Sequence, residues 1–537
     1  MRIVALLVLI VTSMGLSGQV RAVTAEQPNK LGTVNFLITC SPAAQVKFNT
    51  AVTLLHSFWY DKAEQEFRSV AAADPRCAMA YWGVAMTHWT ELWGPPDDQD
   101  VKIASLAIAQ AEKIGAKSDK ERRFIAAIAA FFHSYNVTEG TGSAVEYTAV
   151  MRSLHASYPG DRQVALFYAL ALIATASPDD KRFKNQRAAG AILEPIFEAE
   201  PNDPGAAHYI IHAYDNPTLA SRALRAASEY AKIAPAVPHA LHMPSHTFTD
   251  LGLWEDAILS NRASLKAEYQ NYPTEHLGSS TFDDFHSTDF LEYAYLQAGR
   301  LAEARTLAMQ VSVVRAVPGS PYAAAEYVLT LTRPLIERQQ WQAAAKFSLP
   351  GGSVSFTKHP TAAAIVYYVR GLGDARSNKV SAAGRELRQL AALATWAKAQ
   401  HNRFLVRFTG TEQSSLAGWI ARARGQDATA LSKLRMAAAT VTRGESPPPL
   451  LVWPVQEQLA EMLLELHEPA EARSAFQQSL KENPNRLQSL SGAAETALAT
   501  GDRVAALGYY RSIVASCPQA DANVLEVNQA RRFTLSP

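Results

Sequence analysis

The segment 469-PAEARSAFQQSLKENP-484 decides the fold of this chain, together with 503-RVAALGYYRSIVASCP-518, which follows it. In each segment an alanine precedes an aromatic residue by four positions, and a proline stands at the end. The equivalent residues are 34 positions apart, from Ala472 to Ala506 and from Pro484 to Pro518. A period of 34 residues is typical of a repeat of two antiparallel helices. The C-terminal end of the chain is therefore predicted to contain two such repeats.

The same period occurs in the middle of the chain, and less regular versions fill the remainder. Ala189, Ala223 and Ala257 are spaced by 34 residues, and so are Pro201 and Pro235. Strands would need an alternating apolar and polar pattern, and no useful length of it occurs. These patterns resemble the tetratricopeptide (TPR) repeat family. The resemblance implies an all-α fold, a right-handed superhelical solenoid of helix–turn–helix repeats.

Five segments are expected along the chain. Residues 1–22 have a basic start, an apolar core and small residues before Ala22, as a cleaved signal peptide does. An N-terminal extension follows over 23–44, and the solenoid with irregular repeats covers 45–443. A Pro-rich break over 444–452 precedes the C-terminal pair of repeats at 453–537. The mature protein is expected to be periplasmic or secreted, with no transmembrane segment after the signal peptide.

Composition and cysteine content narrow the class of protein. The 537 residues have a net charge of +1, and 19% of them are charged, so a nucleic-acid-binding surface is not expected. The three cysteines are Cys40, Cys77 and Cys517. Export permits a disulfide, for which Cys40 and Cys77 form the most local pair, and three buried free thiols are the alternative.

A local excess of histidine marks the candidate functional site. In TPR proteins, as the resemblance implies, repeat positions 2, 5, 9, 12 and 13 line the concave surface. When the repeats are aligned on their terminal prolines and on Ala304, histidine and aspartate occupy such positions in three successive repeats. These residues are His208, His212 and Asp215 in one repeat, His239, His242 and His246 in the next, and His286 and Asp289 in the third.

Imidazole and carboxylate groups gathered in one groove predict a site for a divalent transition metal such as Zn, Cu, Fe or Ni. Three other interpretations of the cluster remain open: general acid–base catalysis, binding of an anionic ligand, and ordinary helix packing. Pro244 interrupts the helix that would carry the second group of histidines, because it has no backbone N–H for the carbonyl of Ala240. Either the helix kinks there, or it begins near Pro244 and leaves His239 and His242 in a loop.

Three segments resemble a group of exported bacterial TPR proteins: 208-HYIIH-212, 242-HMPSH-246 and 77-CAMAYWG-83. The resemblance implies the fold and the export, and it implies no reaction.

Two functions from different classes follow from these patterns. The first is an exported TPR scaffold that binds a protein or peptide partner in its concave groove and needs no cofactor. The alternative is a metal-binding protein or metalloenzyme that uses the histidine and aspartate cluster. A non-enzymatic role is favoured, since no catalytic motif is evident. Tryptophans clustered in the N-terminal repeats suggest glycan stacking as a weaker idea, with helix packing as its alternative.

Overall fold

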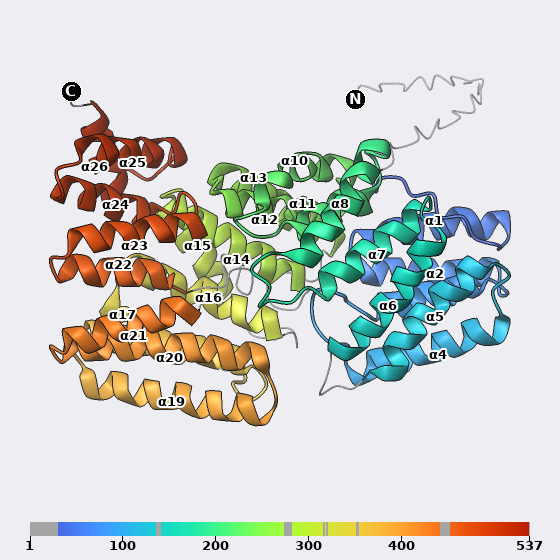
Figure 1. Ribbon diagram of the computed structural model, residues 1–537, viewed down its shortest axis with the longest axis horizontal. Helices are drawn as coiled ribbons and strands as arrows, with labels where there is room; N and C mark the ends of the chain where they lie inside the picture. Colours follow the sequence, from blue (N-terminus) through green and yellow to red (C-terminus); the bar gives the residue numbers. More distant parts are fainter. Residues whose placement is uncertain are drawn as a thin grey trace, which may run out of the picture.

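The computed structural model describes residues 30–135, 141–272, 282–314, 317, 321–350, 354–440 and 452–535. Within these ranges the regular elements are helices, and no strand occurs. The chain forms an all-α, TPR-like superhelical solenoid, in which helix pairs follow one another from the N-terminal repeats, drawn in blue, to the C-terminal repeats, drawn in red (Figure 1). The fold class predicted from the 34-residue period is confirmed.

Each repeat consists of a first helix toward the interior and a second helix outside it. The first helices are α1 (Pro42–His56), α3 (Ala78–Thr87), α5 (Asp119–Ser134), α7 (Arg162–Ala174), α9 (Pro204–Ala213), the pair α11 (Pro238–His242) and α12 (Pro244–Leu251), α14 (Phe282–Gln297), α16 (Pro321–Glu337), α18 (Pro360–Arg376), α20 (Arg403–Ala423), α22 (Val455–Glu465), α24 (Leu487–Ala499) and α26 (Leu525–Leu535). The second helices are α2 (Tyr60–Ala73), α4 (Asp98–Ile114), α6 (Thr141–Ser157), α8 (Lys184–Ala199), α10 (Leu224–Ile233), α13 (Trp254–Asn271), α15 (Leu301–Ser312), α17 (Trp341–Ala345), α19 (Val380–Ala399), α21 (Asp427–Thr440), α23 (Pro469–Glu482) and α25 (Arg503–Ser516), with a short 3-10 helix η1 (Ala220–Arg222) before α10.

Small residues on the first helices let neighbouring helices approach. A Cβ atom added at Gly83 of α3 would lie 2.1 Å from the ring of Phe67 on α2, and one at Gly492 of α24 would lie 2.2 Å from the ring of Phe476 on α23. The same glycine-to-aromatic contact thus occurs at both ends of the chain. It is the packing reason for the alanine, aromatic and proline pattern seen in the sequence.

Some predicted boundaries shift, and others fall outside the described residues. The first helix begins at Pro42, since Ser41 caps it and proline suits the first helical position. The signal peptide at 1–22 lies outside the described residues, and so does the Pro-rich break at 444–452 except for Val452.

Cys40 and Cys77 form a disulfide, with 5.2 Å between their Cα atoms, and Cys517 is a buried free thiol. Two of the clustered tryptophans, Trp82 and Trp89, are buried in the core of the N-terminal repeats. They pack against neighbouring phenylalanine rings, which is the packing role that the sequence offered as the alternative to glycan stacking.

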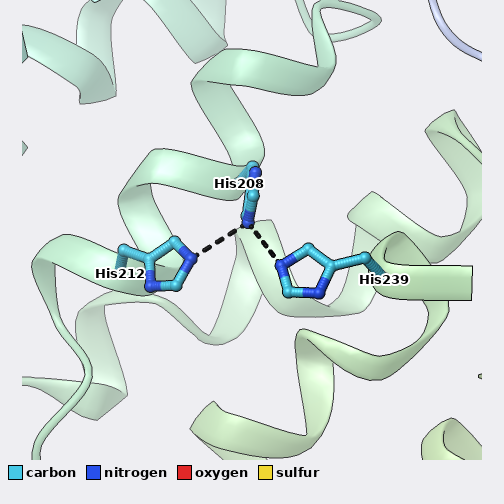
Figure 2. A group of neighbouring side chains, drawn as sticks. All are labelled: His208, His212 and His239. Carbon is cyan, nitrogen blue, oxygen red and sulfur yellow. Dashed lines mark hydrogen bonds between the residues drawn. The ribbon is translucent and has the colours of Figure 1, made fainter. Parts of the chain in front are cut away.

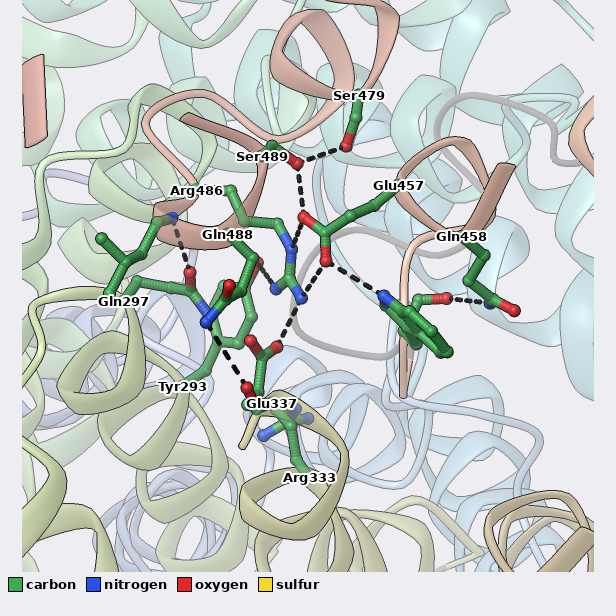
Figure 3. Close-up of polar contacts among 12 residues, drawn as sticks. Tyr293, Gln297, Arg333, Glu337, Glu457, Gln458, Ser479, Arg486, Gln488 and Ser489 are labelled. Carbon is green, nitrogen blue, oxygen red and sulfur yellow. Dashed lines mark hydrogen bonds and ion pairs between the residues drawn. The ribbon is translucent and has the colours of Figure 1, made fainter. Parts of the chain in front are cut away.

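The C-terminal repeats contact the central repeats through buried polar groups, shown in Figure 3. Arg486, just before α24, pairs with Glu457 of α22 at 2.7 Å and with Glu337 of α16 at 2.6 Å. The backbone N–H of Leu487 donates to Gln297 of α14. These contacts join inner helices that are distant in sequence, so the interior of the superhelix is filled with side chains in this region.

In the described part of the chain, no helix has both the length and the apolar character needed to cross a membrane.

Candidate metal centre

Helix α9 carries the first pair of histidines. Asp203 caps its N-terminus by accepting from the N–H of Gly205, and Pro204 occupies the first helical position. His208 and His212 are four residues apart, so they lie on the same face of the helix. The helix is short and almost wholly buried between neighbouring repeats, which holds both rings in place.

Helices α11 and α12 carry the second pair, on either side of the break at Pro244. Met243, between the two helices, keeps right-handed helical backbone angles, and its N–H donates to the carbonyl of His239. Ser260 Oγ donates to the carbonyl of Leu241 at 2.5 Å, so a side chain satisfies a group at the break. The helix therefore kinks at Pro244, as one of the two sequence-based alternatives predicted. The other alternative, in which His239 and His242 lie in a loop, is wrong.

The histidines form two groups of three, which we call trio 1 and trio 2. Trio 1 contains His208, His212 and His239. Nε2 of His208 lies 3.0 Å from Nε2 of His212 and 3.2 Å from Nε2 of His239, as Figure 2 shows. Within a trio, the ligand nitrogens are all within 4.8 Å of one another. Three imidazole nitrogens thus converge on one point.

Trio 2 contains His242, His246 and His286 and has the same construction. Nε2 of His246 lies 3.0 Å from Nε2 of His242 and 3.2 Å from Nε2 of His286. In each trio, two histidines come from positions 5 and 9 of one repeat, and the third comes from position 2 of the following repeat. The 34-residue period relates His208 to His242 and His212 to His246, and the longer third repeat places His286 at the position equivalent to His239.

The contacts of the Nδ1 nitrogens, which are not the nitrogens that converge within the trio, determine the tautomers of the rings in trio 2. Nδ1 of His246 contacts a carboxylate oxygen of Asp215 at 2.9 Å, and Nδ1 of His286 contacts Glu326 at 2.6 Å. Nδ1 of His242 contacts Oδ1 of Asn261 at 2.7 Å, and the amide orientation is set because its Nδ2 donates to a backbone carbonyl. All three partners are acceptors, so each Nδ1 carries a proton, and in the neutral ring Nε2 then presents its lone pair to the centre of the trio.

In trio 1 the same rule applies to His208, whose Nδ1 donates to the backbone carbonyl of His56 at 2.6 Å. A metal-binding histidine almost always donates its second ring nitrogen to a carboxylate or a backbone carbonyl, because this fixes the tautomer and makes the ligand more basic. Three of the six rings, those of His208, His246 and His286, have a partner of this kind, and His242 has a side-chain amide oxygen in its place.

Burial favours the uncharged form of four of the six imidazoles. It lowers the pKa of His208, His212, His239 and His242 well below the usual 6.5, and the neighbouring histidines lower it further. Solvent reaches the cluster at one side, where His212 is half-buried and the side chain of His286 is 17% exposed. These four rings are thus neutral nitrogen donors in a cluster that is partly exposed at His212 and His286.

The two predicted aspartates lie outside the trios. Asp215 contacts the outer nitrogen of His246, so it orients a ring instead of facing the centre of the trio. Asp289 pairs with the buried guanidinium of Arg333 at 2.8 Å, which also binds Glu292 at 2.7 Å. Burial raises the pKa of Asp289 to about 6, and the nearby positive charge of Arg333 opposes this shift. The expectation that both aspartates are ligands is therefore corrected.

Sequence reasoning missed the residues that support the rings. These are the carbonyl of His56, the amide of Asn261, the carboxylate of Glu326 and the rings of Phe58 and Phe290. His56 and Phe58 are about 150 residues away from His208, and no spacing rule connects them. Glu326 lies on the inner helix of the next repeat, which is the only sequence signal that could have pointed to it.

No protein-family model matches the chain, and a search of curated proteins found no match. Solved structures do resemble it. Human IFIT1, as a dimer with PPP-AAAA, is 11% identical with a TM-score of 0.34, and the match covers 82% of this chain and 90% of that one. A monomeric IFIT1 mutant with Gppp-AAAA is 12% identical with a TM-score of 0.37 and the same coverage. The APC/C hetero-tetramer Cut9–Hcn1 is 13% identical with a TM-score of 0.34, covering 91% of this chain and 90% of that one.

Proposed function

We propose that this protein binds transition-metal ions, one in each histidine trio, on a TPR-like scaffold. The observation that carries the proposal is the convergence of three Nε2 lone pairs in trio 2, while every Nδ1 faces an acceptor. Lone pairs held 3.0–3.2 Å apart repel one another unless a cation lies between them. An ion bound about 2.0 Å from each nitrogen would convert this repulsion into three ligand bonds.

The type of ligand limits the choice of metal. The trios offer neutral imidazole nitrogens, whereas magnesium and calcium prefer oxygen ligands. Imidazole suits Zn, Cu, Fe and Ni, and three histidines that leave one position open are the ligand set of catalytic zinc in carbonic anhydrase. We therefore propose copper or zinc as the first ions to test.

Export is part of the same proposal. The apolar N-terminal segment and the disulfide between Cys40 and Cys77 support an oxidising compartment. The partner-binding function predicted from the repeats stays a prediction. We place the metal function first, because two sets of three imidazole nitrogens lie close together in the described residues.

Elemental analysis of protein purified without a histidine tag tests the proposal. We expect two transition-metal ions per chain, either as isolated or after incubation with Cu(II) or Zn(II) and gel filtration. The double variant His242→Ala, His246→Ala should retain one ion, and so should His208→Ala, His212→Ala. The matched control is His133→Ala, which removes an exposed histidine on α5 and should leave two. A chain that retains no transition metal under any of these conditions would overturn the proposal.

Metal binding to trio 1 should release almost no protons at pH 6. An imidazole with the ordinary pKa of 6.5 is about three-quarters protonated at pH 6, so three such ligands would release about two protons per ion. Burial lowers the pKa of His208, His212 and His239 well below 6.5, so these rings are already neutral. Calorimetry of the His242→Ala, His246→Ala variant in buffers of different ionisation enthalpy measures the number released. A release of about two protons per ion would contradict the buried, neutral state of these three rings.

A further inference from the structure

The two trios are neighbours, because one short helix supplies both. His239 and His242 are three residues apart on α11, yet the first belongs to trio 1 and the second to trio 2. Their ring centroids are 6.0 Å apart, and those of His212 and His246 are 6.3 Å apart. Ions about 2.0 Å from their nitrogen ligands would therefore occupy neighbouring sites.

An aromatic ring closes one side of each trio. The ring of Phe58 lies 4.4, 5.5 and 5.7 Å from the three rings of trio 1. The ring of Phe290 lies 5.1, 4.5 and 4.9 Å from the three rings of trio 2. Phe58 adopts left-handed backbone angles at the end of α1, with φ of 53°, where glycine is the usual residue. The chain thus places a large ring at a position where its backbone is strained.

Three protein ligands leave each ion with an open position. Metals bound by three protein ligands take water or a substrate as the next ligand. Within the described residues, the two groups that could hold a metal are these trios, and neither includes a carboxylate. Because Phe58 covers the rings of trio 1 and Phe290 covers those of trio 2, while α11 joins the two trios, we expect a further ligand to bind between the ions.

The charges around the cluster favour an anion there. Two divalent ions bring four positive charges, and the carboxylates in contact with the rings are those of Asp215 and Glu326. If both are ionised, two positive charges remain without compensation in a largely buried site, which is costly. Asp250, one turn beyond His246, is a buried carboxyl group whose pKa burial raises well above its ordinary value. Burial therefore disfavours a further negative charge at Asp250.

We propose that the two trios form a single dinuclear copper centre, in which one oxygen anion derived from water bridges the two ions. This inference rests on the proposed function and goes beyond it, since two ions could also bind independently. The bridge forms when a water bound between the ions loses a proton to the solvent and becomes hydroxide. Two-metal sites in proteins have ions about 3.5–4 Å apart, a distance that one bridging oxygen spans.

Copper is favoured over zinc for two reasons. Divalent copper binds nitrogen ligands more tightly than the other divalent first-row metals. Copper can also be reduced to the monovalent state. Two monovalent ions would carry two positive charges, which the carboxylates of Asp215 and Glu326 would balance. The two carboxylates thus balance the charge of a reduced copper pair without a bridge. They leave an oxidised pair with a positive charge that an anionic bridge would lower.

Electron paramagnetic resonance of the full-length protein loaded with two equivalents of Cu(II) tests the inference. A bridging oxygen couples the two unpaired electrons into a state without net spin. We expect elemental analysis to find two copper ions while spin integration finds much less than one spin per chain. The variant His242→Ala, His246→Ala should bind one copper and regain one full spin.

The possible outcomes separate the two proposals. Two bound coppers with two full spins would overturn the coupled centre and leave the metal-binding function intact. No bound metal of any kind would overturn both, and two zinc ions with no affinity for Cu(II) would overturn the copper assignment. If the double variant does not fold, as judged by circular dichroism, His212→Ala at the half-buried ligand provides the uncoupled comparison. A spin signal that stays absent in a folded variant with one copper would also contradict the bridge.

Discussion

Loading the metal-free protein with Cu(II) or Zn(II) should raise its free energy of unfolding by about 8 kcal/mol when free metal is 1,000 times the dissociation constant, because each of two sites contributes about 4.1 kcal/mol. The gain comes from ligands that converge only in the folded chain. In trio 1 His208 and His239 come from different repeats, as His246 and His286 do in trio 2, and unfolding separates them. Thermal denaturation with and without metal, after treatment with a chelator, measures the effect.

Calcium and magnesium provide the ligand control for this experiment, since neutral imidazoles bind them poorly and the melting temperature should not change. His133→Ala provides the protein control and should show the full metal-induced increase. A melting temperature that no transition metal raises would mean that the trios are packing residues, which is the alternative considered from the sequence.

Replacing Arg486 by alanine should destabilise the protein by about 3–5 kcal/mol, the usual cost of leaving buried charges without their partner. The guanidinium is 1% exposed and lies between the buried carboxylates of Glu337 and Glu457. Without it, the C-terminal repeats lose their charged contact with the central repeats. Chemical denaturation of the variant and the parent chain measures the loss.

Arg435→Ala is the matched control, because Arg435 and Glu471 form an ion pair whose side chains are 52% and 60% exposed. That pair should contribute less than about 1 kcal/mol. Removing all three buried charges, with Arg486→Met, Glu337→Gln and Glu457→Gln, should recover most of the lost stability, since no charge is left uncompensated. A loss for Arg486→Ala no larger than that of the control would show that the network contributes little.

The prediction of the fold succeeded because each repeat contacts mainly its neighbours. The alanine, aromatic and proline residues at 472, 476 and 484 reflect local packing. The contact between Gly492 and the ring of Phe476 is an example. The sequence also predicted which histidines lie together, for the same reason, and their role as metal ligands stays a prediction. Helical spacing placed His208 with His212 and His242 with His246, and the repeat alignment added His239 and His286.

The prediction from the sequence failed for both aspartates, because a residue of the next repeat contacts each of them. Asp289 occupies a groove-facing repeat position, but Arg333 of the next inner helix pairs with it. Asp215 has the right chemistry for a ligand, and its carboxylate instead contacts the outer nitrogen of His246. The position within a repeat indicates the face of the helix on which a side chain lies. It does not indicate which neighbouring residue contacts that side chain.

By itself, the sequence determined the helical repeat, its period and the histidines that share a face, because these depend on contacts within one repeat or between adjacent repeats. Only the tertiary structure decided that six histidines divide into two trios, and that carboxylate, amide and carbonyl acceptors orient their lone pairs inward. The physical reason is that the superhelix brings His56 and Phe58 against His208, more than one hundred residues further along the chain. The stacking of many repeats sets such contacts, and no single period encodes them.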